Sequence, residues 1–178
     1  RGVARVYKVL EENKMIKHYV QVGGMLETGD VVKGKIDWNR RMELMRHHTA
    51  AYIVCGAIRA VLGHEVRSAG SDLTVDRVRL DIFVGKDRRI TPEQLRRIEE
   101  LSNKVIWENR PVRTYFITAR EALERFPEIE LKKDVEMVRI VEIENWDINF
   151  CGGTHVSQTS EVLAVKIIKR ERIAEGTD

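Results

Sequence analysis

The chain has 178 residues, of which 43% are hydrophobic, and its 31 Lys and Arg residues nearly balance its 28 Asp and Glu residues, for a formal net charge of +3. This length can bury a core without disulfides, and the charge balance excludes a polycationic tail while allowing a local basic surface for nucleic acid. With no apolar run of about 18 residues, no secretory signal and only two cysteines, the sequence predicts no membrane span and a cytoplasmic location.

The first 36 residues predict a β-rich segment. Apolar and polar residues alternate over residues 3–9 and 17–22, on either side of a polar turn at 11–14, and a further short strand is expected at 31–36. Gly and Asp residues at the corners are typical of a small barrel. We therefore interpret residues 1–36 as a partial barrel and residues 37–178 as a second domain.

From about Asp37 the hydrophobic period becomes that of a long helix. One stripe recurs at spacings of four and three residues: Leu44, His48, Ala51, Cys55, Ile58 and Leu62. Asp37 or Asn39 can cap its start, and Gly63 supplies the stop signal.

Beyond this helix, strands and helices are mixed. Strands are expected at residues 65–69, 75–84, 112–117, 137–143 and 162–168, with a loop over 144–154. Thr91 and Pro92 announce a helix with an N-cap and a proline at its first position, and a shorter helix opens at Thr118 and ends near Phe126 and Pro127. This order places the chain in the α+β class.

Cys151 and His155 lie four residues apart around Gly152, Gly153 and Thr154. Glycines let a backbone turn sharply, and thiolate and imidazole are preferred zinc ligands. The alternative is a glycine turn with a buried cysteine and a surface histidine, and the spacing leaves both interpretations open.

His48 lies on the apolar stripe of the long helix, where a histidine is hydrogen-bonded within the core or ligates a metal. Its neighbour His47 lies on another face. A second ligand one turn after His48 would stand at position 52, where the sequence has Tyr52.

Taken together, these features resemble the editing domain of alanyl-tRNA synthetases and their free-standing relatives, the AlaX proteins. The resemblance covers roughly residues 31–175. It rests on the segments 41–49, 68–71, 79–82, Trp146-Asp147 and 151–155, which occur in the family's order.

The resemblance implies an antiparallel sheet packed with a long central helix, and a zinc ion held by His48, Cys151 and His155. Tyr52 stands where the family has its second helical histidine, and three protein ligands plus water would make an open zinc site. Cys55, a further turn along, is a remote replacement candidate. The family's glycine-rich front segment, with its serine-sensing threonine, is not found within residues 1–178, so part of the substrate pocket is expected to lie outside this chain or to have been lost.

The implied activity is hydrolysis of serine or glycine from mischarged tRNA(Ala), by a free-standing protein or by part of an ATP-binding alanine–tRNA ligase. An apolar pocket discriminates between such small amino acids by only about 1–3 kcal/mol of binding free energy. A second site that hydrolyses the wrong product is therefore needed. We expect Thr49 to line the pocket and Gly152 and Gly153 to supply backbone donors near His48. Candidate tRNA contacts are Arg40, Arg41, Arg46, Arg59, Arg67, Lys166, Lys169, Arg170 and Arg172.

Two other functions stay open at this point. A tRNA-binding module that lost its zinc site through Tyr52 would bind tRNA without deacylating it. A cysteine hydrolase would use Cys151 with His155 or His48 as its base.

Overall fold

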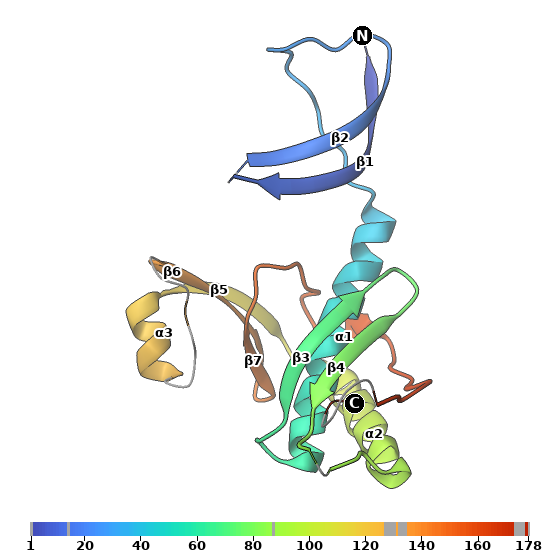
Figure 1. Cartoon of the computed structure of the whole chain (residues 1–178), viewed down its shortest axis with the longest axis vertical. Helices are drawn as coiled ribbons and strands as arrows, with labels where there is room; N and C mark the ends of the chain where they lie inside the picture. The colour runs from blue at the N-terminus through green and yellow to red at the C-terminus, as the bar shows by residue number, and fades with distance from the viewer. Residues whose placement is uncertain are drawn as a thin grey trace. The chain divides into compact units, whose positions relative to one another are not determined.

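The computed structural model describes residues 2–13, 15–86, 88–126, 131, 135–172 and 177, and confirms the α+β class (Figure 1). The chain divides into two compact units, residues 1–36 and 37–178. The assignment of these units to a partial barrel and an editing domain stays a prediction. No helix among the described residues is long and apolar enough to cross a membrane.

The first unit contains one antiparallel hairpin. Strand β1 (Val3–Glu12) pairs with β2 (Met15–Gly23), and a bulge interrupts the register between Val6 and Lys8. The observed turn is shorter than the one predicted at residues 11–14, because β1 extends to Glu12. Asn13 has the left-handed backbone of the turn, at φ 53°. The strand predicted at 31–36 is wrong. Those residues are exposed and pair with no other strand in the described part of this unit.

The long helix α1 (Trp38–Leu62) confirms the prediction from the 3.6-residue period. Asp37 is its N-cap and accepts a hydrogen bond from the Arg40 N–H at 3.1 Å, and Gly63 ends it at φ 99°. Burial is wider than one stripe, since small residues such as Ala50, Ala57 and Gly56 let neighbouring segments approach the middle of the helix from several sides.

The next elements pack against one end of α1. Strands β3 (Arg67–Leu73) and β4 (Val78–Phe83) form a separate antiparallel pair, and both begin two or three residues later than predicted. Helix α2 (Pro92–Trp107) starts at a capping box in which Thr91 and Gln94 each bond the other's backbone N–H. Ile58, Ile82 and Ile98 join these elements in one buried cluster.

A three-stranded sheet forms the other side of the second unit. Its order is β5 (Val112–Thr118), β6 (Met137–Ile143) and β7 (Asp147–Phe150), all antiparallel, and α3 (Ala119–Arg125) covers one face (Figure 1). The loop predicted over 144–154 is therefore wrong in part. A tight turn with Asn145 at φ 53° returns the chain beside β6. The short helix predicted from Thr118 was expected to end near Phe126 and Pro127, and Pro127 lies outside the described residues.

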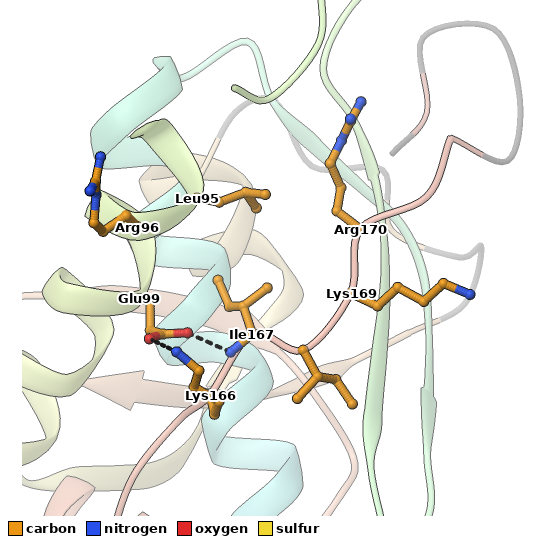
Figure 2. Close-up of a pocket in the computed structure, with 8 residues that line it drawn as sticks. Leu95, Arg96, Glu99, Lys166, Ile167, Lys169 and Arg170 are labelled. Atoms are coloured by element: carbon orange, nitrogen blue, oxygen red, sulfur yellow. Dashed lines mark hydrogen bonds and ion pairs between the residues drawn. The ribbon is translucent and has the colours of Figure 1, made fainter. Parts of the chain in front are cut away.

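The strand predicted at 162–168 is also wrong. A short 3-10 helix (Thr159–Val162) comes first, and an irregular segment follows it. Side chains of α2 occupy the segment's backbone groups: Asn103 bonds both the N–H and the C=O of Val165, and Glu99 accepts from the Ile167 N–H at 2.7 Å (Figure 2). With these groups engaged, the segment has no row of free donors and acceptors for a neighbouring strand.

Candidate metal centre

Three side chains from distant parts of the second unit meet at one point. The Cys151 Sγ lies 3.5 Å from His48 Nε2 and 3.5 Å from His155 Nε2. Their potential ligand atoms all lie within 4.8 Å of one another, and all three side chains are half-buried. The imidazole of α1 and the thiol and imidazole of the 151–155 loop thus form one cluster, here called the triad.

The triad has the spacing of a zinc site. Zinc bonds of about 2.3 Å to sulfur and about 2.05 Å to nitrogen, at a tetrahedral angle, put sulfur and nitrogen about 3.6 Å apart. Both Sγ–Nε2 separations, 3.5 Å, are close to this value. A thiolate and two imidazoles are also ligands that zinc prefers, so the donor set and its spacing fit this metal.

Helix α1 supplies more than His48 to the triad. Thr49 is fully buried, and its Oγ1 lies 3.1 Å from His155 Nδ1 while accepting the Val156 N–H at 3.3 Å. When Nδ1 carries the proton toward Thr49, the Nε2 lone pair of His155 is free for a metal, an arrangement common among histidine ligands. Thr49 therefore orients the ring of His155, and its contact with a substrate stays a prediction.

The loop half of the triad is held from β6. The Cys151 N–H donates to the Arg139 carbonyl at 3.1 Å, and the Arg139 guanidinium donates to the carbonyls of Cys151 and Gly153, at 2.5 and 2.7 Å. A Cβ atom at Gly153 would collide with the imidazole of His48. Glycine is required there because the loop backbone passes directly against the helical ligand.

Two contacts join α1 to the hairpin that precedes the loop. The indole of Trp146 lies against Gly56, where a Cβ would collide with its Nε1, and this Nε1–H donates to the Ile53 carbonyl at 3.2 Å. Arg59 forms an ion pair with the buried carboxylate of Asp147. These two contacts fix the start of β7 against α1.

The segment after His155 is anchored as well. Val156 is 2% exposed in the cluster that includes Ile53 and Ile143. Thr159 is fully buried, accepts the Arg110 N–H at 2.8 Å and donates to the Val105 carbonyl at 2.8 Å. The chain directly after His155 is consequently fixed to the core at two points.

The surroundings of the triad favour a thiolate at Cys151 and a neutral imidazole at His155. Burial raises the pKa of Cys151, but hydrogen bonds with His155, His48, Tyr52 and the Gly153 N–H outweigh it and lower the pKa to about 5. Burial is also the main cause that lowers the pKa of His155 below its ordinary value. Both groups are thus in the protonation states that a metal requires near neutral pH.

Two residues named from the sequence stand apart from the triad. Cys55 is buried in the core with Ile58 and Ile98, and burial raises its pKa to about 11, so its thiol stays protonated. Gly152 is exposed with no atom within 4 Å of where its Cβ would stand. The Gly153 N–H donates to the Cys151 sulfur at 3.2 Å, which engages one of the two expected backbone donors.

Several of the expected tRNA-binding cations have protein partners. The ion pairs are Arg46 with Glu43, Arg59 with Asp147, Lys166 with Glu99 and Lys169 with Glu171. The groove of about 390 Å³ in Figure 2 lies between α2 and residues 166–170, and its lining includes no member of the triad. Contact of this chain with tRNA stays a prediction.

Sequence reasoning missed Arg139, although its two bonds to the loop carbonyls shape the site. A lone arginine within a strand pattern gives no signal of this role. The packing of Trp146 on Gly56 was equally hidden, since a glycine inside a helix predicts only a weaker helix.

The chain is similar to known proteins at two levels. Residues 138–177, which include the Cys151–His155 loop, match the family described as "Threonyl and Alanyl tRNA synthetase second additional domain". Over 177 residues, 98% of this chain, it is 41% identical to an alanine–tRNA ligase of Pyrococcus abyssi and 45% identical to one of Staphylothermus marinus. The chain spans 19% of the length of each of these relatives.

Proposed function

We propose that this chain, which belongs to the family of the second additional domain of threonyl and alanyl tRNA synthetases, hydrolyses the ester between a wrong amino acid and tRNA(Ala). The amino acids are serine and glycine, and the chain acts either free or as part of an alanine–tRNA ligase. The observation that carries the proposal is the convergence of His48, Cys151 and His155, in which the Cys151 sulfur lies 3.5 Å from an Nε2 atom of each histidine, close to the sulfur–nitrogen spacing around zinc.

An aminoacyl ester is already activated, so its hydrolysis needs an oriented water and a polarised carbonyl rather than a strong nucleophile. A zinc ion at the triad would supply that polarisation. His48, Cys151 and His155 would hold it, while Thr49 fixes the orientation of the His155 ring through the 3.1 Å contact with Nδ1. Arg139 keeps the carbonyls of Cys151 and Gly153 turned toward its guanidinium.

The half-burial of the triad suits this reaction. Each of the three side chains is partly exposed, so the small aminoacyl end of a tRNA can reach them while the body of the tRNA stays outside. Partial removal of water also strengthens every electrostatic contact with the ester carbonyl.

The test is deacylation of seryl-tRNA(Ala) by the 178-residue chain, beside alanyl-tRNA(Ala) as the correct product. We expect Ser to be released, and we expect His48→Ala, Cys151→Ala and a strong chelator each to abolish the release. Alanyl-tRNA(Ala) should be largely spared only when the glycine-rich front segment is present. Tyr115→Phe, which changes a hydrogen bond to Glu142 on the α3 side of the sheet, is the matched control and should leave the rate unchanged. Unchanged rates in both ligand variants would refute the proposal.

The lowered pKa of Cys151 favours a second candidate, a cysteine hydrolase in which His48 or His155 acts as the base. The two candidates differ in their inhibitors. A chelator stops the metal-dependent reaction without modifying Cys151. A cysteine hydrolase keeps its activity in the presence of a chelator and loses it when the Cys151 sulfur is alkylated. A chain that binds tRNA but deacylates nothing would instead be the module without zinc.

A further inference from the structure

One face of the β5–β6–β7 sheet carries a row of three residues that ends at the triad. Phe116 on β5 is the register partner of Arg139 on β6, and the Cys151 N–H bonds the Arg139 carbonyl at 3.1 Å, directly after β7. Residues opposite each other in antiparallel strands present their side chains on the same face of the sheet. Ile117, the next residue along β5, packs with Ala122 of α3, so the row lies on the face away from α3.

The far end of this row is an aromatic ring that is open to solvent. Phe116 is 62% exposed, and Met137, its diagonal neighbour on the same face, is 51% exposed. Strand β5 is the outer strand of the sheet in the described part of the chain (Figure 1). Single exposed apolar residues are common on protein surfaces, so the informative property of Phe116 is its place in the row with Cys151.

The length of the row matches the size of one nucleoside. Neighbouring strands lie about 4.8 Å apart, so the two steps from Cys151 to Phe116 amount to about 10 Å. In an aminoacyl-tRNA the amino acid is esterified to the ribose of the terminal adenosine, so this ribose alone separates the ester from the adenine. When the ester carbonyl lies at the triad, the adenine reaches the neighbourhood of Phe116.

The chemistry of the row favours the base over the phosphate. The Arg139 guanidinium, in the middle of the row, already donates to the carbonyls of Cys151 and Gly153. Phe116 and Met137 add a flat ring and an apolar edge with no charge. Proteins that bind single-stranded nucleic acid use such exposed aromatic rings as platforms on which bases stack.

We propose that Phe116 is a substrate-binding residue on which the adenine of the terminal tRNA nucleotide stacks, with Met137 beside it. This inference rests on the proposed function, which places the ester of the same nucleotide at the triad. Stacking on Phe116 would then orient the nucleotide, because its base and its ester would be held at opposite ends of one row.

The experiment measures the Kd of an uncharged RNA hairpin by fluorescence anisotropy at a fixed salt concentration. One hairpin has a single-stranded 3′ end that terminates in adenosine, and the other carries a terminal ribose without a base. Stacking of one base on an aromatic residue commonly changes affinity by about 5–100-fold. We expect the wild-type chain to prefer the complete end by a factor in this range, Phe116→Leu to lose most of the preference and Phe116→Trp to keep it.

Trp107→Leu is the matched control, since it removes a 76% exposed ring from the end of α2 and should leave the preference unchanged. In deacylation of seryl-tRNA(Ala), Phe116→Leu should raise KM with little change in kcat, the result of losing binding that substrate and transition state share. Because the ring of Phe116 is exposed, the urea midpoint of this variant should equal that of the wild type.

A wild-type chain that binds both hairpins equally, or fails to bind either, would overturn the proposal. So would a preference for the complete end that is equal in wild type and Phe116→Leu, because the base would then be held elsewhere. The hairpins carry no amino acid, so the binding result does not depend on deacylation. A preference that requires Phe116 in a chain that deacylates nothing would support the stacking site and refute the proposed function.

Discussion

The two halves of the candidate metal centre are built in different ways. On α1, His48, Thr49 and Tyr52 are placed by a regular helix that local backbone hydrogen bonds maintain from Asp37 to Gly63. The 151–155 loop has no regular structure and is held by partners far away in the sequence, above all Arg139 and the segment around Thr159.

This difference shows where the precision of the site originates. The helix fixes the direction of its side chains before any partner arrives, because residues four apart share a face. The loop acquires its shape only when the core has formed around it, so its contacts decide whether Cys151 and His155 reach His48. Changes in the loop should therefore damage the metal site more than changes in the helix.

The largest expected effect is at Gly153. Gly153→Ala places a methyl group against the His48 imidazole and should lower zinc affinity by about 10–100-fold. Gly152→Ala is the matched neighbour with open space around its Cβ position, and its zinc affinity should equal that of the wild type. Equal losses in both variants would mean that loop flexibility, rather than the approach to His48, is what the glycines provide.

The next effect is at Thr49, where the helix half holds the loop half. Thr49→Val keeps the shape but removes the contact with His155 Nδ1, and zinc affinity should fall by about tenfold. The Val156 N–H also loses its acceptor, which should lower the free energy of unfolding by about 1–3 kcal/mol. Chelator competition and urea titration measure the two effects, with the exposed Thr114→Val as control. Retention of the wild-type affinity would remove Thr49 from the site.

A smaller effect is expected where α1 meets the β6–β7 hairpin. Gly56→Ala gains up to about 1 kcal/mol of helix propensity, but crowding of Trp146 should cost more, typically 1–3 kcal/mol. Urea titration should therefore show a net loss of stability. In a Trp146→Phe background, Gly56→Ala should no longer lower the free energy of unfolding, because the indole that the new methyl group crowds is absent. A stabilised single variant would contradict this packing.

The smallest effect concerns the segment after His155. Glu161 accepts the N–H groups of Ser157 and Gln158 at 2.9 and 3.0 Å, and the Ser157 hydroxyl is the main cause that lowers its pKa. A lowered folded-state pKa adds stability above the unfolded value of about 4.3, and this stability is lost as the pH falls through the folded-state pKa. Glu161→Gln should cost less than about 1 kcal/mol at neutral pH, a gap that closes in acid. A gap that persists at low pH would mean that the charge is not involved.

The same contrast explains how much of the fold could be predicted. Helices α1 and α2 and strand β6 follow from period, caps and alternation, which are local properties of the sequence. The prediction of a strand at 162–168 was wrong because Asn103 and Glu99 of α2 form hydrogen bonds with the backbone of this segment. No local sequence pattern reveals such distant partners. Strand β7 was missed although Ile148 and Phe150 alternate with polar residues over its length.

The candidate site divides in the same way. His48 and the Cys151–His155 pair could be found from their residue types and spacing. Their convergence was predicted from the family resemblance alone, because residue types and spacing do not reveal the support from β6 or the close approach of Gly153. The role of Arg139 and the contact of Trp146 with Gly56 exist only in three dimensions.

The measurement that tests the central claim most directly is the zinc content of the purified chain beside His48→Ala, Cys151→Ala and His155→Ala, each shown to be folded by circular dichroism. If the three side chains form one metal site, the wild-type chain will carry zinc in a one-to-one ratio and each variant will lose most of it. Zinc absent from the wild type, or held equally well by all three variants, would contradict the account.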